Sequence, residues 1–352
     1  MEPMRRPHEA VPIEEIARLP YIDNLPSDGR RPVLQVPYWD AVDREWHLYF
    51  IAPDGHIGRL AGGESAYGAY FARSPADPSR DIELTISTLI TQHLSFPRVL
   101  NKLHQFESDV HNCAAVLEKY HLISSAAQGA TYTGILISTE LEYLMALVRG
   151  MYDLLNEIVR EIAPLLVTLT DEKHRVVPKQ LPTSFAEIAL HGSEPRSGNE
   201  IVEKRGLPPA LANWYVGEAR AFELLRRLRD AVIHRGVQLP TVLDLPDLGL
   251  AVASDEHPWK EFAIWEGVEP VNKRLVPLRL AFAAIVNHAI GASERLVGAL
   301  ASCVQLPQAV GRDIRVYLRS DVTRRLVQIP ELLRQPWERS AFVVGGLETP
   351  CD

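Results

Sequence analysis

The chain has 352 residues, of which 46% are hydrophobic and 23% are charged, and these values are ordinary for a folded globular protein. Its formal net charge of −8 excludes a surface that is basic throughout, so binding of nucleic acid would need a local patch of positive charge. The cysteines, Cys113, Cys303 and Cys351, are far apart and form no CxxC pair, which argues against a disulfide framework and a structural zinc site.

The N-terminal region predicts an arm followed by a small sheet. Residues 1–32 are rich in proline and charge, and we expect a loosely ordered arm that lies on a neighbour. The start of this arm has no apolar core of the signal-peptide kind, and with unpaired cysteines this predicts a cytoplasmic protein. Runs of β-branched and aromatic residues at 33–39 and 46–51 predict an antiparallel β-hairpin, with a third strand if residues 57–60 join it.

From about residue 81 the pattern becomes helical. Asp81 is placed to cap a first helix through residues 84–90, and Pro97 to open a second that continues to about Ser124. The clearest pattern in the chain follows, because apolar residues recur in steps of three and four between Leu141 and Leu165. This predicts a long amphipathic helix packed against other helices.

The two ends of that long helix are less well defined. Thr139 and Glu142 have the spacing of a capping box, although the helix could also start near Thr133. Pro164 is expected to end or kink it. Residues 168–207 predict a long connection with a short helix around 184–191, and a connection of this length is often functional.

The second half of the chain predicts two more helices and a tail. Pro208-Pro209 opens a helix that stops at Gly236, a natural residue just past a helix end. Residues 237–272 predict an irregular region, with aromatic side chains that should pack: Trp259, Phe262 and Trp265. Residues 274–304 predict another helix, kinked at Pro277, and the tail predicts a strand at 314–318 and a helix at 329–334.

These elements together predict a mainly α protein: an up-and-down helical bundle with a small N-terminal antiparallel β-hairpin and long connections. The expected organisation is an arm and hairpin region at 1–80, a helical bundle at 81–305 and a C-terminal tail at 306–352 that packs on the bundle. The apolar stretch 275–300 is interrupted by charged and polar residues, so we expect a buried amphipathic helix and no membrane partner.

The helix that ends at Gly236 carries the candidate site. Its apolar stripe passes through position 229, where the residue is Arg229, and a guanidinium beside a packing face needs an anion or a groove. Asp230 and His234 are four residues apart and share a helix face. His234 lies in the last turn, where the helix dipole favours its protonated form. Nearby arginines predict a local cationic cluster: Arg220, Arg226, Arg227 and Arg235.

An arginine followed by a polar residue, three more positions and a histidine is the R-x4-H pattern of the HEPN superfamily, and Arg229–His234 resembles it. Members of that superfamily are helical-bundle proteins, many of them metal-independent ribonucleases. A long amphipathic helix containing residues 147–155 precedes the motif helix, as in that family. The resemblance extends over roughly residues 97–305.

The resemblance implies an endoribonuclease of the toxin-like or defence-related kind that uses no metal and no other cofactor. His234 would act as general acid or base, Arg229 would hold the phosphate, and Asp230 would orient the imidazole or maintain the geometry of the motif. The remaining basic residues would bind RNA: Arg226, Arg227 and Arg235.

Residues five apart on a helix point about 140° away from each other, so Arg229 and His234 of one chain do not converge easily. The resemblance implies that two copies of the motif face each other across a homodimer.

Other interpretations of the same residues stay open at this point. The chain could be a non-catalytic scaffold or regulatory module of the same fold that binds a protein partner. Arg229 would then pair with a carboxylate from another helix, and Asp230 and His234 would form an ordinary exposed pair. A metal-binding bundle is a third interpretation, because His104, Glu107 and His111 share a face and Glu118-x-x-His121 follows. No second Glu-x-x-His exists, which favours a hydrated polar face over a metal site.

Overall fold

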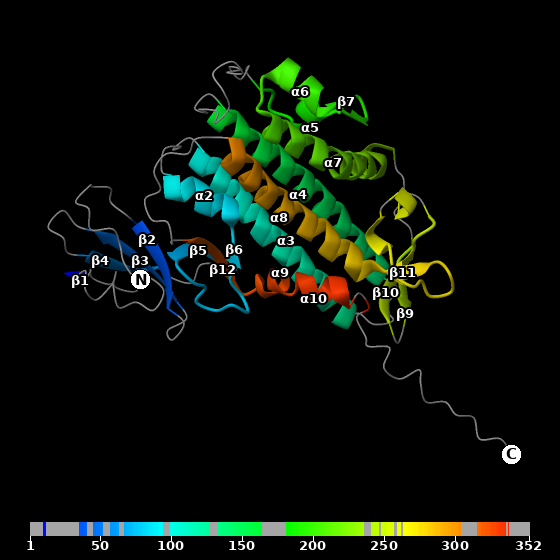
Figure 1. Cartoon of the computed structure of the whole chain (residues 1–352). Helices are drawn as coiled ribbons and strands as arrows, with labels where there is room; N and C mark the ends of the chain where they lie inside the picture. The colour runs from blue at the N-terminus through cyan, green and yellow to red at the C-terminus, as the bar shows by residue number, and fades with distance from the viewer. Residues whose placement is uncertain are drawn as a thin grey trace.

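The computed structural model describes residues 10–11, 35–40, 45–51, 57–62, 67–93, 99–126, 132–163, 181–235, 241–245, 248–256, 259–261, 263–303, 315–335 and 337. Over these residues the protein is mainly helical, with small antiparallel sheets around the helices (Figure 1). The predicted mainly α class is therefore confirmed.

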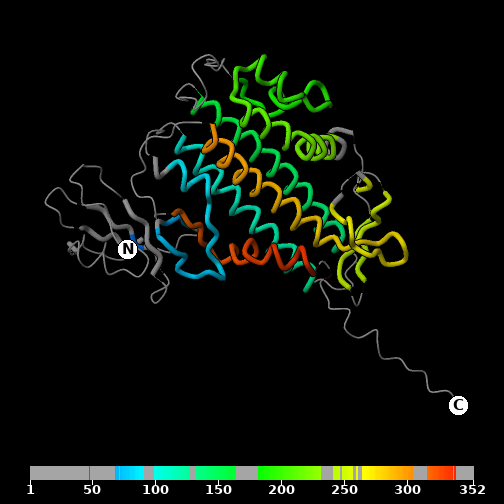
Figure 2. Tube along the Cα trace, viewed as in Figure 1, coloured from blue at the N-terminus to red at the C-terminus, as the bar shows by residue number. Residues whose placement is uncertain are grey.

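Four long helices form the centre of the molecule and lie side by side (Figures 1 and 2). They are α3 (Leu100–Ala126), α4 (Thr133–Ile162), α7 (Pro209–Arg235) and α8 (Leu278–Cys303). Each agrees with a predicted helix to within a few residues. The short helices around them are α2 (Thr85–His93), α5 (Phe185–Ala189), α6 (Gly198–Arg205), α9 (Arg324–Val327) and α10 (Ile329–Arg334).

The start of α4 illustrates how a local signal can be overridden. The helix begins at Thr133, and the Thr139 hydroxyl donates to the carbonyl of Ile135 at 3.0 Å inside the helix instead of capping its start. The predicted apolar stripe is buried as expected, with Leu144, Val148 and Ile158 each at 0% exposure. Helix α4 ends at Ile162, and Pro164 lies outside the described residues.

Aromatic side chains join α4, α5 and α7 in the core. The ring of Phe185 lies 4.8 Å from that of Phe222 and 5.2 Å from those of Tyr152 and Tyr215, measured between ring centroids. Each large buried aromatic of this kind stabilises the fold by roughly 2–3 kcal/mol. The short helix α5 is thereby fixed to the bundle although it has only 5 residues.

The N-terminal hairpin is confirmed as part of a larger antiparallel sheet. Strands β2 (Gln35–Asp40), β3 (Glu45–Ile51) and β4 (Ile57–Gly62) pair in sequence, so the third strand does join. Strand β1 (Ala10–Val11) pairs with β4, which corrects the expectation of a loose arm for those residues. The rest of the predicted arm lies outside the described residues.

A second sheet brings the tail of the chain together with two strands that precede α2. The tail strand β12 (Arg315–Ser320) confirms the predicted strand and pairs antiparallel with β5 (Tyr67–Ala72) on one side and β6 (Ile82–Glu83) on the other. Strand β5 was not predicted. Residues from all three predicted parts of the chain, 1–80, 81–305 and 306–352, therefore share one sheet.

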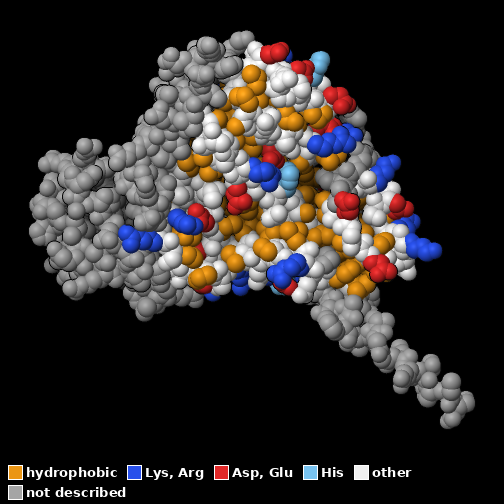
Figure 3. All heavy atoms as spheres, viewed as in Figure 1, with side chains coloured by type: hydrophobic (Ala, Val, Ile, Leu, Met, Phe, Trp, Pro, Cys, Tyr) orange, Lys and Arg blue, Asp and Glu red, His pale blue; other side chains and the backbone are white. Residues whose placement is uncertain are grey.

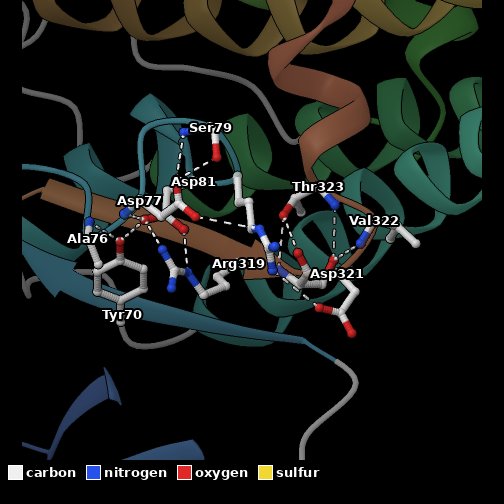
Figure 4. Close-up of polar contacts among 11 residues, drawn as sticks. Tyr70, Ala76, Asp77, Ser79, Asp81, Arg319, Asp321, Val322 and Thr323 are labelled. Carbon is white, nitrogen blue, oxygen red and sulfur yellow. Dashed lines mark hydrogen bonds and ion pairs between the residues drawn. The ribbon is translucent and has the colours of Figure 1, made fainter. Parts of the chain in front are cut away.

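Asp81 does not cap a helix, because β6 follows it and α2 begins only at Thr85. Its carboxylate accepts hydrogen bonds from Nε and Nη2 of Arg319, each at 2.5 Å, and from the Tyr70 hydroxyl (Figure 4). The side chains of Arg319 and Asp81 are 5% and 0% exposed. The prediction was wrong because the Asp81 carboxylate forms a buried ion pair with Arg319 of β12 and is therefore not available to cap the helix.

Residues 237–272 hold more regular structure than predicted. A third sheet pairs β9 (Leu243–Leu245), β10 (Gly249–Ala253) and β11 (Leu275–Pro277). In the connection predicted at 168–207, β7 (Leu190–His191) likewise pairs with β8 (Glu194–Pro195). Pro277 ends β11 just before α8, so the predicted kink inside a helix is wrong. Trp259 and Trp265 are buried as expected, at the short 3-10 turns 259–261 and 263–265, whereas Phe262 lies outside the described residues.

The described helices include none with an apolar stretch that would cross a lipid bilayer. Cys113 and Cys303 are buried free thiols in the core, and Cys351 lies outside the described residues.

Candidate functional site

Arg229, the arginine of the predicted motif, keeps 26% of its side chain exposed on α7. Its Nη1 donates a hydrogen bond to Oδ1 of Asp230 at 3.1 Å. Arg226, one turn earlier, places its Nε 3.8 Å from the other oxygen of the same carboxylate. Asp230 is therefore shared by two guanidinium groups of its own helix.

Arg229 and its neighbours line a cleft of about 670 Å³, whose other walls come from α4 and from residues 184–205. The wall carries six cationic and two acidic side chains, an excess of four positive charges in a chain of net charge −8. On the face drawn in Figure 3, by contrast, side chains of both signs are interspersed. Such a local excess of one sign attracts anions. The charged residues of the wall are Arg149, Arg196, Lys204, Arg205, Arg226, Arg229, Glu187 and Asp230.

Helix α4 holds the wall formed by α5 through two polar side chains. Nδ2 of Asn156, a residue with 0% exposure, donates to the carbonyls of Pro182 and Thr183 at 3.0 and 2.8 Å. One turn earlier, Oδ1 of Asp153 accepts from the Phe185 amide at 2.8 Å, which satisfies a free amide at the start of α5. Burial raises the pKa of the Asp153 carboxyl, while this amide and the charge of Arg149 act in the opposite direction.

Helix α6 carries Lys204 and Arg205 to the cleft. Ser197 and Glu200 form a reciprocal capping box at its start, and Gly206 ends it at φ +69°, a left-handed conformation that glycine adopts without strain. Nη2 of Arg205 donates to the backbone carbonyl of Glu187 at 2.9 Å, which ties α6 to α5. Basic residues in the last turn also suit the negative end of the helix dipole.

Of the remaining predicted site residues, one lines the cleft, one does not, and the side chains of two lie outside the described part of the chain. Arg226 lines the cleft as expected of an RNA-binding residue. Arg227 does not line it, and its Nε lies 3.3 Å from Oε1 of Glu223 on the same helix. The side chains of His234 and Arg235 lie outside the described part of the chain, although α7 continues to Arg235.

The residues of the alternative metal-site interpretation are engaged with other groups. Glu118 accepts from Arg325 Nε at 2.5 Å and from Arg324 Nη2 at 2.9 Å, and these arginines lower the pKa of its carboxyl. Glu107 accepts from the Ser87 hydroxyl at 2.9 Å, and burial raises its pKa. Within the described ranges, no three His, Cys, Asp or Glu side chains gather closely enough to share a metal ion.

Four of the six cationic residues of the wall were not identified from sequence. Arg149, Arg196, Lys204 and Arg205 come from α4, from the residue after β8 and from α6, far from the motif in the chain. One signal was present: Ser197 and Glu200 have capping-box spacing, which predicts a helix start in the segment we expected to be a connection. No pattern in the local sequence indicates that these side chains line the same cleft as Arg229.

The chain was compared with protein-family models, curated proteins and solved structures, and none of them matches it. The HEPN resemblance therefore depends on the motif and on the helical context alone.

Proposed function

We propose that the protein is a HEPN-like up-and-down helical bundle that binds RNA in the cleft and cleaves it as a metal-independent endoribonuclease. The observation that supports this most is the location of Arg229, the arginine of the R-x4-H segment, on the wall of a cleft with an excess of four positive charges. A phosphodiester chain is the common cellular ligand for such a surface. The acidic net charge of the chain does not conflict with this, because the cationic charge is local.

The proposed reaction needs a base, an acid and a group that stabilises the phosphate. His234 takes the proton of the 2′-hydroxyl as the O2′–P bond forms, and a histidine returns a proton to the 5′-oxygen as the P–O5′ bond breaks. The products are a 2′,3′-cyclic phosphate and a 5′-hydroxyl. Arg229 stabilises the charge that develops on the phosphate. Asp230, which accepts a hydrogen bond from Arg229, holds that guanidinium in position.

A homodimer is part of the proposal. Residues five apart on one helix diverge by about 140°, so a second copy of the motif supplies the histidine that Arg229 of the first copy lacks.

The test is cleavage of RNA in the presence of EDTA by the wild-type protein and by His234→Ala and Arg229→Gln. We expect the wild type to cut and to leave a 2′,3′-cyclic phosphate, and each variant to lose at least about a hundredfold in rate. A substrate with 2′-deoxyribose at the cut position should resist. Arg220→Gln is the matched control, because Arg220 is 64% exposed on the same helix and is not among the residues of the cleft wall. Cleavage that survives in His234→Ala would refute the proposed chemistry.

The second candidate is a non-catalytic module of the same fold that binds a protein partner. It is favoured by large apolar side chains exposed where α3 ends and α4 begins: Leu122 at 56%, Tyr132 at 57% and Ile135 at 71%. Exposed apolar groups close together are typical of interaction surfaces. Absence of both cleavage and RNA binding by the wild type would favour this candidate.

A further inference from the structure

Three arginines of the cleft have buried donors without acceptors. The Nε atoms of Arg149, Arg196 and Arg205 are shielded from solvent, yet none donates a hydrogen bond to any described residue. They come from three separate parts of the chain, and all three residues line the same cleft. A buried donor left unpaired costs about 1–3 kcal/mol, so three of them in one cleft wall require an explanation.

A phosphate group is the acceptor that this arrangement fits. The guanidinium is planar and presents its donors in a fork that matches the oxygens of a phosphate. Among the acidic groups of the wall, Asp230 is already shared by Arg226 and Arg229, and Arg205 reaches Glu187 through the backbone carbonyl of that residue. The two carboxylates of the described wall therefore accept no hydrogen bond from the three arginines. The charge of Arg149 acts on Asp153 and that of Arg196 on Glu200, but their buried Nε atoms still lack an acceptor.

The cationic groups of the cleft fall into two sets by origin. Arg226 and Arg229 come from α7 and share Asp230, whereas Arg149, Arg196 and Arg205 come from α4 and from residues 196–205. We propose that Arg149, Arg196 and Arg205 form a phosphate subsite of their own, which binds a backbone phosphate of RNA other than the one held at Arg229. The identity of the ligand as RNA rests on the proposed function.

The other lining residues indicate how RNA is recognised. Between the charged side chains the described wall offers only small or aliphatic residues and no aromatic ring: Ser184, Ala186, Leu190 and Gly192. Stacking of bases, which gives single-strand binders much of their affinity, has no platform there. A cleft of about 670 Å³ is also larger than one phosphate requires. The subsite therefore recognises the spacing of phosphates along the RNA backbone. Its affinity for RNA should depend little on base sequence and strongly on salt concentration.

The experiment measures binding of uncleavable 2′-O-methyl oligonucleotides by fluorescence anisotropy in EDTA over a series of salt concentrations. Arg149→Gln and Arg196→Gln are compared with the wild type and with Arg220→Gln, which removes the same charge from a residue outside the cleft wall. We expect each cleft variant to weaken binding of a pentanucleotide about tenfold, as for loss of a charged hydrogen bond. The slope of log affinity against log salt should fall by about 0.7, the value for one phosphate contact.

The length of the oligonucleotide distinguishes the contributions of the two sets of arginines to binding. A dinucleotide has a single phosphodiester, which occupies the Arg229 site, so Arg196→Gln and Arg149→Gln should leave its binding unchanged. Equal losses for both lengths would refute a separate subsite, as would equal losses in the cleft variants and Arg220→Gln. Binding of inorganic tripolyphosphate without any binding of the oligonucleotide would assign the site to a small phosphorylated molecule and overturn the assignment to RNA.

The proposal of a phosphate subsite and the proposal of nuclease activity can be refuted independently of each other. If wild-type protein does not cut unmodified RNA but the cleft variants bind the pentanucleotide less tightly, the subsite stands and the proposed catalysis fails. If the protein cuts RNA and the cleft variants change neither its affinity nor its KM, the catalysis stands and the subsite is wrong.

Discussion

Arg319 in the sheet and the three arginines of the cleft differ in the partners of their buried donor atoms. In the sheet, Arg319 is 5% exposed, and Asp81 accepts from both its Nε and its Nη2 (Figure 4). In the cleft, Arg149, Arg196 and Arg205 bury their Nε atoms with no acceptor among the described residues. Arg319 has its counter-charge built into the fold, whereas the cleft has an excess of four positive charges along its wall.

The difference separates structural charges from charges that face a ligand. A buried ion pair with its hydrogen bonds satisfied fixes the position of the two elements that carry it, here the segment before β6 and the strand β12. Unpaired donors that converge on a cleft add no such internal contact, so they destabilise the empty protein and stabilise the bound one. The three predictions below concern stability alone, without any ligand, and the first and the last test this distinction.

The largest effect is expected in the sheet. Arg319→Met leaves the buried Asp81 carboxylate without its cation, and we expect a loss of about 3–5 kcal/mol in the free energy of unfolding, measured in urea. Arg315→Met on the same strand is the control, because Arg315 is 53% exposed and pairs with Glu83 at 2.7 Å. That variant should lose about 1 kcal/mol or less. Similar losses in both would show that burial of the Asp81 pair is unimportant, and the double variant Asp81→Asn, Arg319→Met should recover part of the stability.

An intermediate effect is expected at Asp109, a half-buried carboxyl on α3. Burial raises the pKa of Asp109 to about 6, and this side chain lines a groove with Asp153 and Glu157. Between its unfolded value of 3.8 and about 6 the folded state binds more protons than the unfolded state, so wild-type stability falls as the pH rises through this range.

Asp109→Asn removes this penalty. We expect the variant to be more stable than the wild type at pH 7.5 by about 1 kcal/mol, a value reduced for partial solvent screening. The gain should shrink as the pH falls through 6 and vanish near pH 4, where both states of the wild type are protonated. Thermal denaturation at several pH values measures the difference, and a gain independent of pH would contradict the assigned titration.

The smallest effect is expected in the cleft. Arg196→Gln removes a charge whose electrostatic neighbour Glu200 is exposed to solvent, so the free energy of unfolding should stay within about 0.5 kcal/mol of the wild type or rise slightly. Urea denaturation without ligand, at low salt, gives the comparison. A loss above about 2 kcal/mol would mean that Arg196 has a structural role like that of Arg319.

The helices were predictable because their signals are local. The steps of three and four between Leu141 and Ile162 and the prolines before α7 depend only on near neighbours in sequence, and the four long helices follow them. Strand β5 and the role of Asp81 were not predictable in this way. Their partners lie in β12, and Asp81 and Arg319 are 238 positions apart.

The same reasoning explains how much of the cleft was foreseen. Arg226, Arg229 and Asp230 occupy adjacent turns of one helix, so spacing alone groups them. Arg149, Arg196 and Arg205 join them only because Asn156 and Phe185 hold the segment after residue 181 against α4 and α7. A motif on a single helix can thus be found from sequence, whereas a wall assembled from several elements needs the fold.

The position of β12 between β5 and β6 has a consequence for synthesis of the protein on the ribosome. The residues of α2 to α8 all emerge before residue 315, so the helices can pack while β5 and β6 still lack the strand that joins them. Such pairing of distant segments is slow, because a long loop of chain must close before any contact forms. Until then Asp81 is a carboxylate without its guanidinium, and a chain released early would carry that unpaired charge and two unprotected strand edges.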